Sequence, residues 1–168
     1  MSSELALAAT LRAIARLIDA AVAGANLAVF QGSEVSSLSP ELVEGGTAAA
    51  SKPQLNLFPY FVSMNPGWSR EFLPMRDAVG ASIERPPLAV DAHLILSAHA
   101  TQSYQAEALL GIAMRALHDE PTLSRDRITD LLAPPANNNA ALIAALANAR
   151  LADQFERVKI LPLNLNPA

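Results

Sequence analysis

The spacing of apolar residues at the start of the chain predicts a helix followed by a short strand. Between residues 3 and 23, apolar side chains recur every three or four positions, which is typical of a helix with one buried face. Ser2 or Ser3 can cap the start of this helix, and Gly24 is a natural stop. The short apolar run at 27–31 predicts a strand. The expected buried stripe consists of Leu7, Leu11, Ile14, Leu17, Ile18 and Ala21.

The pattern then changes from a polar stretch to a second strand. Residues 32–52 are small and polar and include Pro40, so we expect a long flexible loop with one helical turn at 40–43. Residues 53–65 predict a strand with apolar side chains on both faces. Pro59 lies within it and cannot donate a backbone hydrogen bond, so it predicts an edge position or a bulge.

The clearest alternation of the chain lies at 88–98. Every even-numbered position there is apolar, whereas the odd-numbered positions include Asp91 and His93, with His99 one residue beyond. A period of two predicts a strand with one face in the core and one face of mixed polarity. We expect the mixed face to lie against a helix, water or a neighbouring subunit.

Two further helices are predicted after this strand. The apolar spacing at 101–118 predicts a helix, which Thr101 or Ser103 can cap. A shorter helix is predicted at 124–132, where Ser124 is the expected cap and two prolines come after the last turn.

The order of these elements indicates the fold class. Residues 140–152 fit a helix or a strand equally well, and the alternation at 155–161 predicts a last strand. Helices and strands are therefore mixed along the chain, which favours an α+β (mixed α/β) fold. We expect residues 1–168 to form a single domain, in which helices cover a mostly antiparallel sheet of about four strands.

Composition excludes several classes of function. The chain has no cysteine, a net charge of −4 and only 12 basic residues, so neither a disulfide framework nor a nucleic-acid-binding surface is expected. It also lacks a long uncharged apolar stretch and a basic leader, and we therefore expect a soluble protein without membrane insertion or signal peptide. Hydrophobic residues make up 51%, which suggests surface that is buried against other subunits.

Asp91 and His93 are the strongest candidates for chemistry. They are separated by about 6.6 Å along one strand face, but His99 lies about 20 Å beyond His93, too far to bind the same ion. The sequence shows no third ligand and no catalytic motif, so we expect no metal, no cofactor and no enzymatic activity.

A connector at 65–87 carries the candidate interface residues. It contains the only tryptophan of the chain together with several arginines, a combination common in the anchors of protein interfaces. The alternative, that the tryptophan lies in the core and the arginines are solvated, is about as well supported. The candidates are Trp68, Arg70, Arg76, Asp77 and Arg85.

Three blocks of sequence resemble the cap, or tail-terminator, proteins of phage-tail-like contractile injection systems. The first is QLNLFPYFVSMNPGWSREFLPMRDAVGASIERPPLAVDAHLILSAHA, the second AEALLGIAMRALHDEPTLSRDRI and the third LADQFERVKILPLNL. Together with the first helix, the resemblance spans most of residues 1–165. The chain departs from the family pattern at Pro59, where an aliphatic residue is usual, and at His99, where tyrosine is frequent.

The resemblance implies a structural role without catalytic residues. Such caps form a ring, expected here to be a homohexamer, on the finished inner tube and sheath, and thereby stop their polymerisation. We therefore expect tube and sheath proteins as partners. The chain would be made in the bacterial cytoplasm and become the end component of a particle that can be released from the cell.

Two other interpretations stay open. One is an adaptor that binds other proteins, with Trp68 in a peptide-binding loop and no place in a particle. The other is a small metal-dependent enzyme that uses Asp91 and His93.

Overall fold

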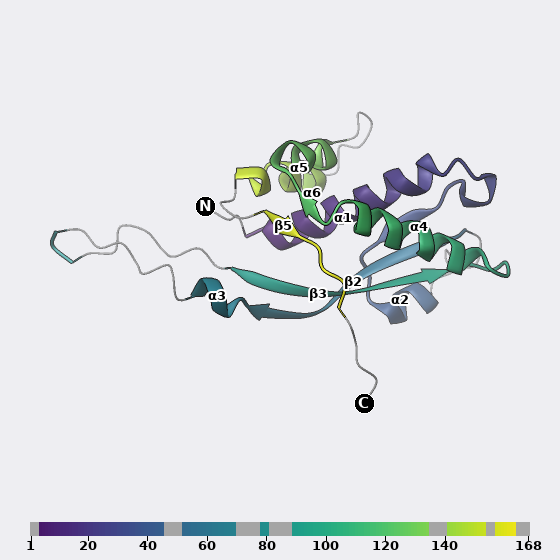
Figure 1. Cartoon of the computed structure of the whole chain (residues 1–168), viewed down its shortest axis with the longest axis horizontal. Coiled ribbons are helices and arrows are strands. Elements are labelled where there is room, and N and C mark those ends of the chain that lie inside the picture. Colours follow the sequence, from purple (N-terminus) through teal and green to yellow (C-terminus); the bar gives the residue numbers. More distant parts are fainter. Residues whose placement is uncertain are drawn as a thin grey trace.

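The computed structural model describes residues 4–45, 52–69, 78–80, 89–134, 141–153 and 157–163 (Figure 1). Its helices are α1 (Ala6–Gly24), α2 (Pro40–Gly45), α3 (Pro66–Ser69), α4 (Gln105–Asp119), α5 (Arg125–Leu132) and α6 (Ala141–Ala147), with single 3-10 turns at η1 (Ala28–Phe30) and η2 (Leu151–Asp153). Its strands are β1 (Glu34–Ser36), β2 (Gln54–Met64), β3 (Val90–His99), β4 (Thr122–Leu123) and β5 (Val158–Lys159).

The described strands form two separate sheets. The larger has the order β1-β2-β3, in which β1 runs parallel and β3 antiparallel to the central strand β2. The smaller is an antiparallel pair of β4 and β5. The predicted α+β fold class is confirmed, although the strands are divided between two sheets rather than gathered in a single one of about four.

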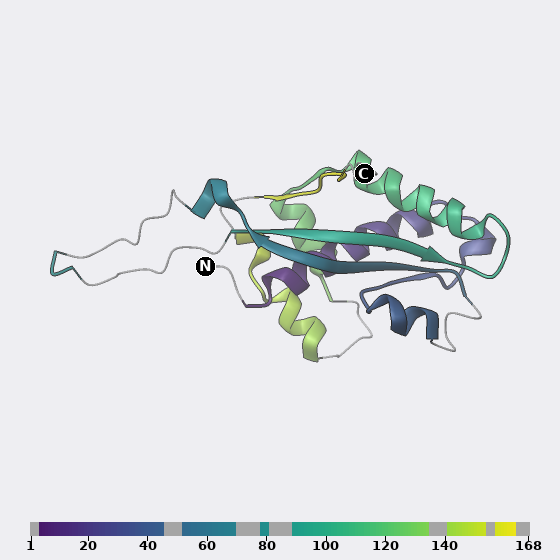
Figure 2. The ribbon, with the colours of Figure 1, turned by 90° about the horizontal axis from the view of Figure 1, so that it is seen from below.

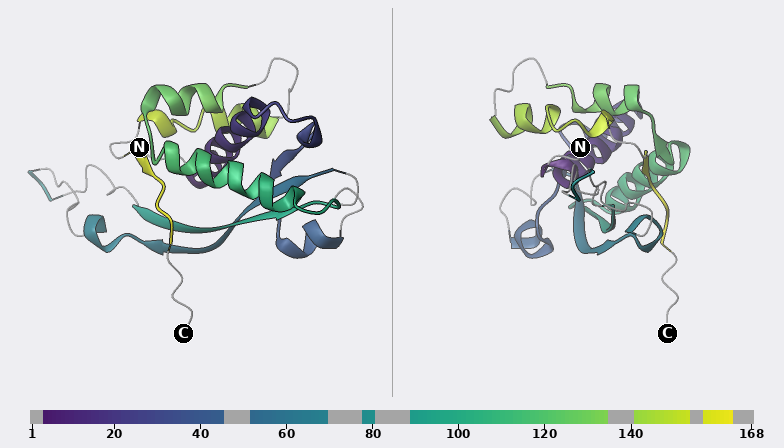
Figure 3. Two further views of the ribbon diagram at one scale, coloured as in Figure 1. Left: turned by 45° about the vertical axis from the view of Figure 1, so that its right-hand side comes forward. Right: turned by 90° about the vertical axis from the view of Figure 1, so that its left-hand side faces the viewer.

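The helices lie in layers around the larger sheet. In Figure 1, α1 and α4 cover one face of the ribbon formed by β2 and β3, while α2 lies on the opposite side near one end. Figure 2 shows α2 and α6 on the same side of the molecule, and Figure 3 shows α5 and α6 beyond α1, away from the sheet. No helix within the described part of the chain is both long enough and apolar enough to cross a bilayer.

Helix α1 packs into two hydrophobic clusters at once. One edge of its buried face, which includes Ala13 and Leu17, meets α5, α6 and η2. The other edge, which includes Ile14 and Ile18, meets α4 and the larger sheet. The predicted helix and its stop at Gly24 are confirmed, but only half of the predicted stripe is fully buried. Ile14, Leu17 and Ile18 are buried, whereas Leu7, Leu11 and Ala21 are half-buried. Ala9, Ala13 and Val22 complete the buried face.

The first predicted strand is wrong, because residues 28–30 form the 3-10 turn η1. Leu27 and Val29 are exposed there, and only Phe30 is buried in the core. The apolar run therefore lacks the alternation of buried and exposed side chains that a strand would show. The sheet begins later, at β1.

The predicted loop at 32–52 is wrong at β1, and its predicted helical turn is confirmed as part of a longer helix. Glu34–Ser36 is a strand and Pro40–Gly45 is a helix, which extends the single turn expected at 40–43. Side chains of β2 hold this segment in place: the Gln54 amide donates a hydrogen bond to the Ser36 hydroxyl, which in turn donates one to Asn56. Residues 46–51 lie outside the described part of the chain.

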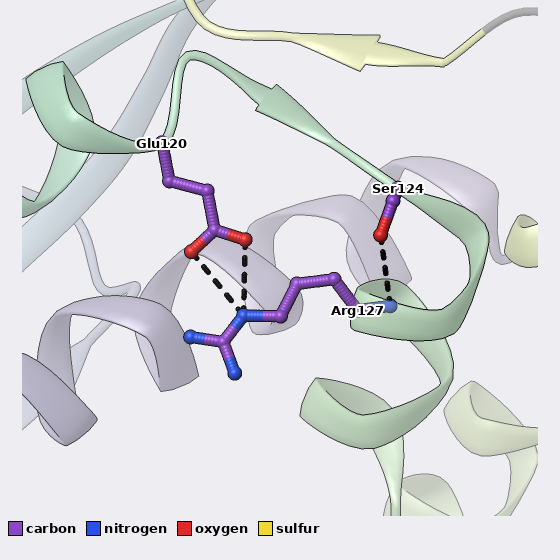
Figure 4. Close-up of polar contacts among 3 residues, drawn as sticks. All are labelled: Glu120, Ser124 and Arg127. Atoms are coloured by element: carbon purple, nitrogen blue, oxygen red, sulfur yellow. Dashed lines mark hydrogen bonds and ion pairs between the residues drawn. The ribbon is translucent and has the colours of Figure 1, made fainter.

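The predicted helix caps are confirmed for one helix and wrong for another. Helix α5 starts as predicted: the Ser124 hydroxyl accepts a hydrogen bond from the backbone N–H of Arg127 at 3.2 Å (Figure 4). The Arg127 Nε also donates to both carboxylate oxygens of Glu120, at 3.0 and 3.2 Å. Neither Thr101 nor Ser103 caps α4, which begins at Gln105. The expected caps at residues 2 and 3 lie outside the described range.

The structure decides between the two alternatives left open for residues 140–152. The stretch at 140–152 contains helix α6 and the turn η2. The predicted strand at 155–161 is confirmed only at Val158–Lys159, and residues 154–156 are not among those described.

Candidate protein interface

The ribbon of β2 and β3 is bent by one extra residue. Pro59 pairs with Leu94 and Phe61 pairs with His93, so Tyr60 is inserted without a partner of its own. Such a bulge re-aims the side chains beyond it. Of the two alternatives predicted from Pro59, the bulge is confirmed, whereas the edge position is wrong because β2 is the central strand.

On the face of the ribbon away from α1 and α4, the first half of β2 is covered. Asn56 is fully buried, and its amide group accepts a hydrogen bond from the Leu38 N–H and donates one to the Leu38 carbonyl, both at 3.0 Å. The Ser36 hydroxyl also donates to Asn56, at 2.8 Å. These bonds fix the segment that leads into α2 against the sheet.

Beyond the bulge, the same face is exposed and rich in aromatic side chains. Cross-strand pairing places Phe61 beside His93, and their ring centroids are 5.3 Å apart. Tyr60 approaches the same imidazole edge-on, with centroids 6.0 Å apart. Phe61 is 55% exposed and Ile95, the next residue on this face of β3, is 47% exposed. We name Tyr60, Phe61, His93 and Ile95 the aromatic patch.

The opposite face of this half of the ribbon is also apolar. Val62 and Met64 are exposed there, and so is Val90, the cross-strand partner of Met64. The ribbon therefore presents large apolar side chains in two directions. Exposed clusters of large apolar side chains are typical of sites where proteins meet other proteins, so the ribbon is the strongest candidate interface in the described part of the chain.

The structure separates the residues considered for metal chemistry. Asp91 accepts a hydrogen bond from the Asn65 Nδ2 at 3.0 Å, whereas His93 lies against the two aromatic rings. His99 Nε2 is 3.1 Å from the Ser97 hydroxyl, and β3 runs unbroken between the two histidines. Among the described residues, no three His, Cys, Asp or Glu side chains gather as a metal site.

The interface residues expected from the connector are largely outside the described ranges. Trp68 lies in the short helix α3, at the end of the ribbon, while Arg70, Arg76, Asp77 and Arg85 are not described. Their role stays a prediction. The sequence pattern did not single out Tyr60 and Phe61, because apolar content on both faces of 53–65 fits a strand buried on both sides as well as one with an exposed face.

A separate charged cluster lies on α1. Burial lowers the pKa of Arg12, and the neighbouring Arg16 lowers it further. Burial raises the pKa of Asp19 and Glu34 adds to this, while the arginines and a hydrogen bond from the Val35 N–H oppose it. Two positive and two negative side chains balance, so this cluster is not a surface that attracts a charged partner.

Comparison with known proteins adds the decisive observation. The Pvc16 N-terminal domain profile matches residues 9–167. The chain belongs to the Pvc16 N-terminal domain family. Membership links it to phage-tail-like contractile injection systems. No curated protein and no solved structure matches the chain significantly. The region matched as a Pvc16 N-terminal domain includes the ribbon, its aromatic patch and both hydrophobic clusters.

Proposed function

We propose that this chain is a structural cap subunit, or tail terminator, of a contractile injection system. In this role it assembles as a ring, with six copies as the expected number, on the finished inner tube and sheath and ends their polymerisation. It performs no enzymatic reaction. Membership of the Pvc16 N-terminal domain family over 159 positions (9 to 167) carries the proposal.

The exposed surface of the ribbon supports a role in assembly. A terminator acts by contact alone, so it needs accessible surface that becomes buried in the particle. The aromatic patch supplies such surface, since Tyr and Phe are enriched where proteins bind each other. The tube, the sheath and other copies of the chain are the proposed partners.

Particle length tests this function directly. Cells that produce the particle but lack this chain should form tubes and sheaths of uncontrolled length, and supplying the chain again should restore one length. Electron microscopy of purified particles measures this distribution. An unchanged distribution in the absence of the chain would refute the cap function.

The adaptor interpretation predicts a different result. It requires capture of soluble partners without sheath or tube protein. Pull-downs with the purified chain, using assembled sheath and tube as one set of prey and the soluble fraction of the same cells as the other, distinguish the two functions.

A further inference from the structure

One segment of the chain covers the first half of the ribbon face that carries the aromatic patch. It comprises residues 33–45, including β1 and α2, and we name it the strap. Strand β1 pairs with β2 at three positions, from Glu34 opposite Gln54 to Ser36 opposite Asn56. In Figure 1, α2 lies on the side of the sheet opposite α1 and α4. The covered and the exposed halves of this face therefore adjoin each other along β2.

The surface beneath the strap is polar. Gln54 and Asn56 are the two buried residues with polar side chains in the described part of the chain. The Gln54 amide donates a hydrogen bond to the Ser36 hydroxyl, and the Asn56 amide binds both backbone groups of Leu38. On the opposite face of β2, buried leucines enter a hydrophobic cluster instead. Water can replace the hydrogen bonds of the strap when it leaves, whereas it cannot replace apolar packing.

Few apolar contacts hold the strap to the rest of the molecule. Within residues 33–43, only Val43 is fully buried and Val35 is half-buried, whereas Leu38 and Leu42 are 46% and 64% exposed. Neither hydrophobic cluster has a buried member from the strap, although Val35 packs against one of them. The Val35 N–H is held by a polar contact, a hydrogen bond to Asp19 of α1. Segments with few buried apolar contacts open at a lower free energy than the core.

We propose that the strap is a gate over the candidate interface. It detaches from β2 as one unit while both hydrophobic clusters stay folded. Its detachment joins the covered half of the ribbon face to the aromatic patch and so doubles the accessible length of that face. The inference rests on the proposed cap function for what the gate controls, namely binding to the tube and sheath.

Native-state hydrogen exchange tests the opening. The backbone N–H groups of Val35, Leu38 and Val43 all donate hydrogen bonds when the strap is in place. These three amides should share one level of protection, at least about tenfold lower than that of amides in the middle of α1 and β3. Protection equal to that of α1 and β3 would show that the strap opens only on global unfolding, and would overturn the inference. Fast exchange of Val43 alone would show fraying of α2, which also overturns it.

A disulfide between the strap and β2 prevents the opening, and the chain has no cysteine of its own to interfere. Glu34→Cys is combined with Gln54→Cys, since these residues are partners in register. Cα atoms of neighbouring strands lie about 5 Å apart, within the range that a disulfide bridges. Oxidation should raise the protection of the Val35 amide to the level of β3, and reduction should reverse this. Protection that does not change on oxidation would contradict the gate.

A matched control places the disulfide away from the ribbon. Thr122→Cys is combined with Lys159→Cys, since these residues are exposed partners in the small sheet of β4 and β5. Oxidation of this variant should leave the exchange of the strap unchanged. Thermal unfolding of both reduced variants establishes that the substitutions leave the fold intact.

Binding to uncapped particles tests what the gate controls. Particles from cells that lack this chain are the probe, and co-sedimentation measures binding. The oxidised strap variant should bind at least about tenfold more weakly than its reduced form, because locking the closed state removes the population that can bind. The control variant should bind equally well in both redox states.

The remaining outcomes separate the gate from the cap function. If the oxidised and reduced strap variants bind equally well, opening is not required and the gate is refuted, while the cap function stands. If the unaltered chain does not bind uncapped particles, the cap function fails, and with it the role assigned to the gate. Hydrogen exchange decides independently of either result whether the strap opens as a unit.

Discussion

Asn56 shows how one polar side chain can continue a sheet. Strand β1 pairs with β2 only as far as Ser36, and the amide of Asn56 then binds both backbone groups of Leu38. A side-chain amide offers the same donor and acceptor as a peptide group, so it takes the place of a further strand residue. The order of the segment leading to α2 depends on it.

Replacing Asn56 with alanine should destabilise the fold strongly. Asn56→Ala leaves the N–H and the carbonyl of Leu38 without their partner, and we expect the free energy of unfolding to fall by about 2–3 kcal/mol. Urea unfolding measures the change. Gln102→Ala, at an exposed position, is the control and should change stability by less than about 0.5 kcal/mol. Equal effects of the two variants would contradict this role for Asn56.

At the residue scale, the sequence predicted features that depend on one side chain alone. It missed features that depend on contact with a residue far away in the sequence. Pro59 predicted the bulge because its missing N–H is a property of the residue itself. The burial of Asn56 depends on Leu38, 18 positions away, and no local pattern reveals that pairing. The exposure of Phe61 was equally hidden, since an apolar side chain in a strand fits a core or an interface.

At the scale of elements, the start of α5 was predictable from the local sequence, whereas the start of α4 was not. Ser124 caps α5 through a bond to Arg127, three residues on, so the local sequence was sufficient. Helix α4 begins at Gln105 without a side-chain cap, and the residue before it, Tyr104, is left-handed. The Gln105 side chain binds the Val29 carbonyl 76 positions away, a contact that no local pattern reveals. Thr101 and Ser103 lie outside the helix and do not cap it.

The cap of α5 gives the prediction at this scale. Ser124→Ala removes the acceptor for the Arg127 N–H and should lower the free energy of unfolding by about 1 kcal/mol. Ser124→Asp keeps an acceptor at the same position and should retain most of the stability. Chemical denaturation of the three proteins measures the difference. If both variants lose the same free energy, the hydroxyl does not act as a cap.

At the scale of the whole molecule, α1 is shared by two clusters that have few other residues in common. Leu17 belongs to the cluster with α5 and α6, and Ile18 belongs to the cluster with α4 and the sheet. The sequence predicted the α+β class from the order of the elements, because the long helices and strands differ in the period of their apolar residues. It did not predict two sheets, since strand pairing depends on contacts between distant segments.

Sharing of α1 predicts that the two clusters unfold together. Leu17→Ala and Ile18→Ala should each lower the free energy of unfolding by about 2–5 kcal/mol, as is usual for buried aliphatic side chains. Each should also lower hydrogen-exchange protection in both α5 and β2. Loss of protection in only one cluster per variant would show that the two halves open independently.

The position of α1 also has a consequence for synthesis of the protein. The helix is synthesised roughly 100 residues before α4 and α5, which bury its two edges, a delay on the order of 5–20 s at ordinary rates of translation. During that interval Ile14, Leu17 and Ile18 have no packing partners, so the nascent helix exposes apolar side chains to solvent. The helix can therefore pack only after α4 and α5 have been synthesised. Until then its apolar face is of the kind that chaperones bind.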